Sequence, residues 1–126
     1  MELTITKIDY GCEDTIVSAQ TAYGPLRGVW KASGIPAEGR VYTAGIMVTP
    51  SLPGRIRPAQ AQGKLPVFDY RLRLNHIIAP CQLVEGKSLV CFGEKEQLVC
   101  EIPEAAGILP GEAAEIYASD QELFWV

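Results

Sequence analysis

Glycine and proline interrupt this chain at short intervals, and that spacing is the strongest constraint on its fold. The sequence contains 12 glycines and 9 prolines, spread along its length. The segments between them are short and rich in valine, isoleucine, threonine and aromatic residues, which is typical of β-strands separated by turns. A fold built from many short strands is therefore expected.

Ten segments have the composition of strands. In Val67–Leu74, four apolar residues alternate with three charged ones, and this period of two predicts a strand with one face in the core and one in water. The same alternation in Leu26–Ala32 predicts that Arg27 and Lys31 point into water. The other predicted strands are Glu2–Tyr10, Thr15–Tyr23, Arg40–Thr49, Ile77–Val84, Ser88–Phe92, Gln97–Ile102, Ala114–Ala118 and Glu122–Val126. The apolar residues that alternate in Val67–Leu74 are Phe68, Tyr70, Leu72 and Leu74.

The sequence has one segment that could form a helix, and it is short. The segment Pro103–Leu109 begins with a proline suited to a first helical turn, but Gly107 and Pro110 limit it to about one turn. We therefore predict an all-β domain, a small OB-like or SH3-like barrel with an extra hairpin and at most one short helical turn. An immunoglobulin-type sandwich is the alternative, but its Cys…Trp…Cys spacing is missing.

The length of 126 residues predicts one domain, 1–126, with a proline- and glycine-rich loop at 50–66. Within Arg40–Thr49, the run Ile46-Met47-Val48 is apolar on both faces, which favours a strand that is central or covered on both sides. Apolar stretches are too short for a membrane helix, so we expect no membrane association. The polar, acidic start of the chain lacks the pattern of a signal peptide, so a cytoplasmic protein is expected.

The four cysteines are widely spaced and include no CxxC pair. A structural zinc site needs closely spaced ligands, so no metal is expected. Cys91 and Cys100 lie in strand-like apolar runs, which favours buried free thiols. A disulfide across a hairpin is the alternative and would imply export.

Charge is unevenly distributed along the sequence. Residues 1–24 carry a net −3, residues 25–74 carry eight Lys or Arg against two acids for a net +6, and residues 75–126 carry a net −7. If folding preserves this separation, the acidic side would attract a basic partner and the basic side an anion. Alternatively, the folded strands mix these charges over the surface.

Catalytic patterns are missing around the single histidine, His76, which follows Asn75 at a predicted strand end and is interpreted as a turn or core residue. There is no GxSxG or GxGxxG motif. Gly86-Lys87-Ser88 matches only the end of a phosphate-binding loop, since position 81 is Cys81 instead of glycine. We expect no cofactor and no enzymatic activity, although a barrel pocket can assemble a site from distant residues.

The first functional hypothesis is protein binding. The ending LVCFGEKEQLVCEIPEAAGILPGEAAEIYASDQELFWV resembles the strand-turn-strand tail of small all-β bacterial immunity-type proteins, through Gly93, Gly111 and the last hairpin. The resemblance implies a cytoplasmic inhibitor that binds and neutralises a toxin or nuclease, with no catalytic residues. An acidic surface suits a basic toxin domain, with Phe124 or Trp125 as an anchor. The acidic candidates are Glu94, Glu96, Glu101, Glu112, Glu115, Asp120 and Glu122.

The second hypothesis is an OB-like module that binds single-stranded nucleic acid. Such modules combine a positive groove with stacking aromatic residues, and the middle third interleaves Trp30 and Tyr42 with basic residues. A sequence pI near 5.0 weakens attraction to phosphate, so nucleic acid is the less favoured partner. The basic candidates are Lys31, Arg40, Arg55, Arg57, Lys64, Arg71 and Arg73.

Overall fold

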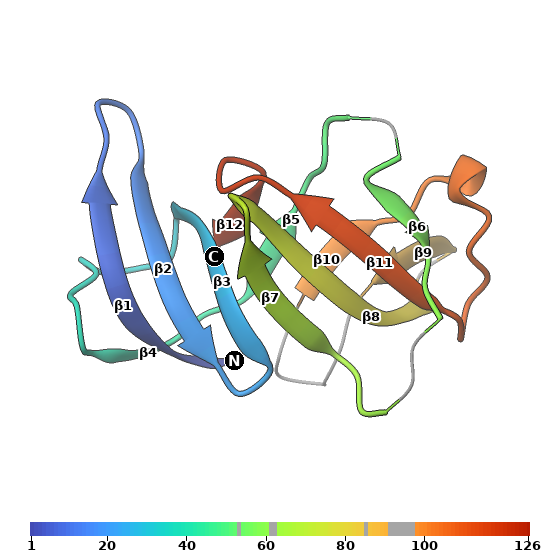
Figure 1. Cartoon of the computed structure of the whole chain (residues 1–126), viewed down its shortest axis with the longest axis horizontal. Helices are drawn as coiled ribbons and strands as arrows, with labels where there is room; N and C mark the ends of the chain where they lie inside the picture. The colour runs from blue at the N-terminus through green and yellow to red at the C-terminus, as the bar shows by residue number, and fades with distance from the viewer. Residues whose placement is uncertain (53, 61–62, 85, 91–97) are drawn as a thin grey trace.

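The computed structural model describes residues 1–52, 54–60, 63–84, 86–90 and 98–126, and strands dominate these ranges (Figure 1). One 3-10 turn, η1 (Glu104–Ala106), follows the tenth strand. No helix within the described ranges is long and apolar enough to cross a membrane. The strands are β1 (Glu2–Tyr10), β2 (Thr15–Thr21), β3 (Gly24–Trp30), β4 (Val41–Thr43), β5 (Ile46–Val48), β6 (Ile56–Pro58), β7 (Val67–Arg71), β8 (Leu74–Val84), β9 (Lys87–Val90), β10 (Leu98–Glu101), β11 (Ala113–Ala118) and β12 (Leu123–Trp125).

The strands follow one continuous path that curls into two half-barrels (Figure 1). The order is β4-β1-β2-β3-β12-β5-β10-β9-β8-β11-β6, with β7 paired to β8. Near the C-terminus, β12 lies between β3, to which it is parallel, and β5. A hydrogen bond from the Phe68 N–H to the Tyr23 carbonyl (2.9 Å) joins β7 to the turn between β2 and β3 and connects the two halves directly.

Strand alternation explains where the core forms. On β11, Ala114, Ile116 and Ala118 are fully buried, while the residues between them are partly exposed. On β8, Ile77 and Ala79 are buried in the same way. This period of two turns one face of each curled sheet inward. The predictions of an all-β, barrel-like fold and of one short helical turn after Pro103 are confirmed.

The hairpin between β7 and β8 corrects the prediction for Val67–Leu74. The strand ends at Arg71, and the chain reverses through Leu72 (φ 52°) and Arg73 (φ 64°), both in the left-handed region. This two-residue turn matches the twist of the flanking strands. Leu72 is consequently 95% exposed instead of buried in the core.

His76 and Asn75 lie inside β8, so the prediction that they mark a strand end is also wrong. The turn begins three residues before Asn75, which the alternation of the sequence concealed. His76 is partly exposed, whereas Asn75 is fully buried.

Two further strand predictions are corrected. Arg40–Thr49 is interrupted at Ala44. The prediction that Ile46-Met47-Val48 is central is confirmed, because β5 lies between β12 and β10, but it is not covered on both faces, since Met47 is 40% exposed. The predicted loop 50–66 contains a strand, β6, which pairs with β11. The proline within β6 is compatible with its place at the end of the sheet path, because an edge strand tolerates a missing N–H.

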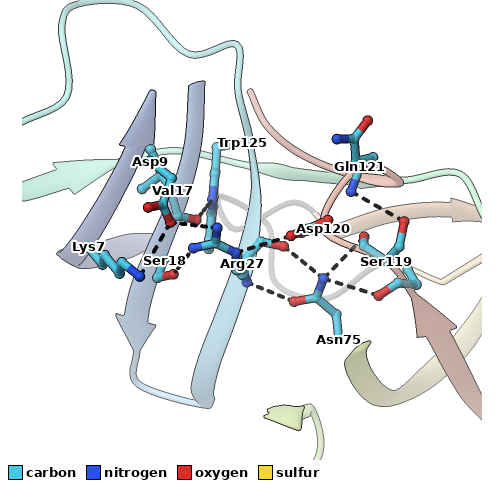
Figure 2. A network of polar contacts seen from close by, with 11 residues as sticks. Lys7, Asp9, Val17, Ser18, Arg27, Asn75, Ser119, Asp120, Gln121 and Trp125 are labelled. Carbon is cyan, nitrogen blue, oxygen red and sulfur yellow. Dashed lines mark hydrogen bonds and ion pairs between the residues drawn. The ribbon is translucent and has the colours of Figure 1, made fainter. Parts of the chain in front are cut away.

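A buried amide joins the half-barrels. Asn75 Oδ1 accepts a hydrogen bond from the Arg27 N–H (2.7 Å), and Asn75 Nδ2 donates one to the Arg27 carbonyl (2.7 Å). The same Nδ2 lies 3.2 Å from the Ala118 carbonyl oxygen and 3.3 Å from that of Ser119 (Figure 2). The Asn75 side chain on β8 therefore forms hydrogen bonds with the backbone of β3 and with the backbone at the end of β11.

The Arg27 side chain extends this junction (Figure 2). Its Nη2 lies 2.6 Å from Asp9 Oδ2, its Nη1 donates to Ser18 Oγ (2.8 Å), and its Nε lies 3.2 Å from Asp120 Oδ2. The side chain is only 16% exposed, so the prediction that it points into water is wrong. Two carboxylates compensate its charge at this partly buried position.

Cys100 is a buried free thiol and Cys12 an exposed one, and Cys81 is also buried. Burial raises the pKa of the Cys100 thiol to about 12, which keeps it protonated and unreactive near neutral pH. The prediction of a buried free thiol is therefore confirmed for Cys100. Cys91 lies outside the described residues.

Gly28 permits the close approach of β12 to β3. A Cβ atom at this position would lie 2.5 Å from the carbonyl oxygen of Leu123, where backbone blocks it. We therefore expect Gly28→Ala to lower the free energy of unfolding by at least about 2 kcal/mol, as overpacking does, which lowers Tm by about 8 °C for a chain of this size. Thermal unfolding followed by circular dichroism measures the shift.

Gly34→Ala is the matched control, because a Cβ there meets no atom and the cost comes from its φ of 89° alone. A Gly28→Ala variant that unfolds at or above the temperature of Gly34→Ala would contradict the close packing of β3 and β12.

Candidate functional site

Folding mixes the charges that are separated in the sequence. Arg27, from the basic middle third, pairs with Asp9 from the first segment and Asp120 from the last. Lys31 lies 3.7 Å from Asp14. These contacts favour the alternative in which the strands interleave opposite charges, so the predicted separation into an acidic and a basic side does not survive in this region.

Glu115 belongs to a compact polar cluster on the exposed face of β6, β8 and β11. Its Oε1 lies 2.6 Å from Arg57 Nε, and its Oε2 lies 2.9 Å from His76 Nε2. The ring of His76 stacks on Tyr117 at 4.5 Å, and the Arg57 guanidinium lies 5.2 Å from the same ring. Partial burial raises the pKa of Glu115, but hydrogen bonds from Arg57 and His76 outweigh it and lower the pKa below its usual value. Both carboxylate oxygens of Glu115 therefore already bind side chains of this protein.

Glu122 fastens the segment that follows β5 to the turn before β12. Its Oε2 accepts a hydrogen bond from Ser51 Oγ (2.7 Å), and its Oε1 accepts one from the Ser119 N–H (2.9 Å). Partial burial raises the pKa of Glu122, but the hydrogen bonds from Ser119 and Ser51 outweigh that effect and lower it to about 2. This carboxylate is a structural tie and not a free surface charge.

The remaining acidic candidates do not form a common surface either. Glu112 accepts a hydrogen bond from the Leu109 N–H (2.7 Å) and closes the turn before β11. Trp125 is fully buried and donates through Nε1 to the Val17 carbonyl (3.0 Å), so its prediction as an anchor for a partner is wrong (Figure 2). Glu94 and Glu96 lie outside the described residues.

The basic candidates are similarly divided. Arg71 lies 2.9 Å from Asp69, and Arg57 and Lys31 are also paired. The aromatic residues expected to stack on bases are engaged: Trp30 packs edge-on against Tyr42 at 5.3 Å, and their polar atoms bind backbone carbonyls in the β3–β4 connection. In the part of the chain that the structure describes, four candidates have no recorded ion pair: Arg40, Arg55, Lys64 and Arg73.

One of these cations, Arg55, lines a cleft in the described part of the chain. This cleft of about 830 Å³ lies between β5, β6 and η1, a size common for ligand sites. Leu52 and Met47, which line it, are 56% and 40% exposed. Arg57 and Glu101 are the other charged residues on its walls. The apolar lining includes Met47, Leu52, Ile56, Pro103, Ala105 and Ala106.

Sequence reasoning included Arg55 and Arg57 but missed the apolar residues beside them. The signal was present in Leu52 and Ile56, two large apolar residues inside a segment interpreted as loop. Because β6 is short and contains a proline, its composition concealed the strand. Its pairing with β11 brings the segment 54–57 opposite β5 and η1.

Comparisons with protein-family models, curated proteins and solved structures returned no match. In the described ranges, no group of three or more His, Cys, Asp and Glu side chains is arranged to hold a metal ion. The candidate site therefore rests on the geometry of the cleft.

The tie through Glu122 predicts how acid affects stability. Because its pKa is about 2 in the folded protein and 4.5 without these contacts, its stabilising contribution is complete above about pH 5 and is lost as the pH falls toward 2. We expect Glu122→Gln to lower the urea midpoint at pH 7 and to flatten the dependence of that midpoint on pH between 5 and 2.

Glu104→Gln serves as the control, since this exposed side chain has no recorded contact within the described part of the chain. Parallel pH profiles for Glu122→Gln and the unchanged protein would show that the carboxylate does not hold the segment in place.

Proposed function

We propose that this chain is a non-catalytic binding protein and that another protein occupies the cleft between β5, β6 and η1. The observation that carries the proposal is the cleft itself, with its apolar walls and with Arg55, which forms no ion pair with the described residues. Apolar area left in water at a concave site is a typical feature of a binding surface. Leu52 and Met47 stay exposed there, and their burial by a partner would be favourable.

A protein partner fits the site better than nucleic acid. The cleft wall provides apolar side chains where a nucleic-acid groove would need several cations. Arg57, the second cation there, is already neutralised by Glu115 at 2.6 Å. Inhibition of a toxin or nuclease, as in immunity-type proteins, is one role that this binding would serve, with the cleft in place of the acidic surface proposed from sequence.

Photo-cross-linking tests the proposal. A benzophenone amino acid at position 52 is expected to cross-link a protein from the source cells, whereas the same group at position 35 is not. Ile35 is 85% exposed and belongs to the connection between β3 and β4. Strand β4 lies at the end of the molecule opposite η1 (Figure 1). The cross-linked protein is then purified and its affinity for the unmodified chain is measured by calorimetry.

Matched substitutions give the quantitative result. Leu52→Asp should weaken binding of that purified partner about tenfold or more, because it removes apolar burial and adds a desolvation cost at the interface. Ile35→Asp should leave the dissociation constant unchanged. Cross-linking at position 35 alone, or equal effects of the two substitutions on affinity, would reject the cleft as the binding site.

A further inference from the structure

The strand that forms one wall of the cleft has an unpaired edge. β6 is the last strand of the sheet path and pairs only with β11 among the described strands. The Arg55 carbonyl accepts a hydrogen bond from the Tyr117 N–H (2.8 Å), and the Ala59 N–H donates to the Ala113 carbonyl (3.0 Å). In an antiparallel ladder, residues whose N–H and C=O point toward the neighbouring strand alternate with residues whose N–H and C=O point away from it. The N–H and C=O of Ile56 and the C=O of Pro58 therefore point away from β11.

Ile56, which carries two of those outward groups, lines the cleft. Gly54, Arg55, Ile56 and Arg57 all line it, and β5 with η1 forms the opposite wall. Among the described strands, only β11 pairs with β6, so its other edge has no described strand beside it. An unpaired edge of this kind is a template for an additional strand.

We infer that the partner contributes an extended peptide segment that pairs with β6 as an added strand. This inference rests on the proposed function and specifies its mode. The incoming backbone would exchange two hydrogen bonds with Ile56 and donate one to the Pro58 carbonyl. Because Pro58 has no backbone N–H, the N–H of Ile56 is the one donor on this edge of β6. A short peptide segment is therefore enough to pair with the edge.

The two faces of β6 determine which side chains the segment carries. Ile56 packs against the core, whereas Arg57 lies on the outer face with Glu115 and Tyr117. Residues on an added strand alternate in the same way. Those beside Ile56 enter the apolar cleft, and those beside Arg55 lie next to a cation without an ion pair in the described ranges. Glu101, on the opposite wall, is exposed to water and forms no ion pair with Arg55.

The preferred ligand is therefore an extended segment in which apolar and acidic residues alternate. Suitable probes are three acetylated and amidated seven-residue peptides that alternate glutamate with valine, leucine or phenylalanine. We expect at least one to bind the ¹⁵N-labelled full chain saturably and to shift the amide resonance of Ile56. If none of the three binds at millimolar concentration, the inference is overturned.

Backbone methylation distinguishes strand addition from other modes. N-methyl groups on alternate residues remove either the N–H groups that face β6 or those that face away. One methylated set should weaken binding about tenfold, which corresponds to two lost hydrogen bonds, and the other set should bind like the parent peptide. Equal effects of the two sets would contradict strand addition.

Charge reversal tests the role of Arg55. Arg55→Glu should weaken the glutamate peptides about fivefold, as expected for an exposed pair, and should improve binding when lysine replaces glutamate. Arg40→Glu is the control, because Arg40 also has no ion pair with the described residues and belongs to the β3–β4 connection. Strand β4 lies at the end of the molecule opposite η1 (Figure 1). Equal responses of the two variants would reject the assignment of Arg55.

Different results would overturn the proposed protein binding at the cleft and the inferred strand addition to β6. If the purified partner depends on Leu52 but the methylated peptides show no alternation, the protein binds at the cleft by another mode. If the peptides show the alternation but no cellular protein cross-links at position 52, the edge accepts a strand and the proposed protein-binding function fails. If a small apolar carboxylate displaces the peptides and no protein does, the site belongs to a small-molecule carrier.

Discussion

The buried amide of Asn75 holds the two half-barrels in register. It satisfies both backbone groups of Arg27 on the edge of β3, at 2.7 Å each, and also reaches the carbonyls at the end of β11. Because an unpaired polar group buried at this junction would cost about 1–3 kcal/mol, the amide specifies one arrangement of β3, β8 and β11. The placement of β6, which depends on β11, follows from this junction.

The same junction explains where the charges of the chain are used. Arg27 draws Asp9 and Asp120 into internal pairs, and Glu115 and Glu122 are similarly engaged. Acidic residues that look like a partner surface in the sequence therefore stabilise turns and strand contacts. The proposed function therefore relies on features that have no partner among the described residues: the apolar cleft, the outer edge of β6 and Arg55.

The all-β class and most strands could be predicted because they depend on local spacing. Breakers set the strand lengths, and β1 begins and ends at the predicted residues. Other features depend on contacts between distant segments. The turn at Leu72 and Arg73 lacks the usual glycine or asparagine, so the alternation hid it. The burial of Arg27 requires Asp9 and Asp120, 18 and 93 residues away, and no local pattern reveals that pairing. The cleft was missed for the same reason, since its walls come together only through the β6–β11 pairing.

The central claim is that β6 has an open edge beside an apolar cleft, and amide hydrogen exchange tests it most directly. In the free protein, the Arg57 N–H faces β11 and the Ile56 N–H faces away, so adjacent amides of one strand should behave differently. NMR-detected exchange in the absence of ligand should show rapid exchange at Ile56 and slow exchange at Arg57. Equally slow exchange at the two amides would contradict the account, because it would mean that the edge of β6 is already paired.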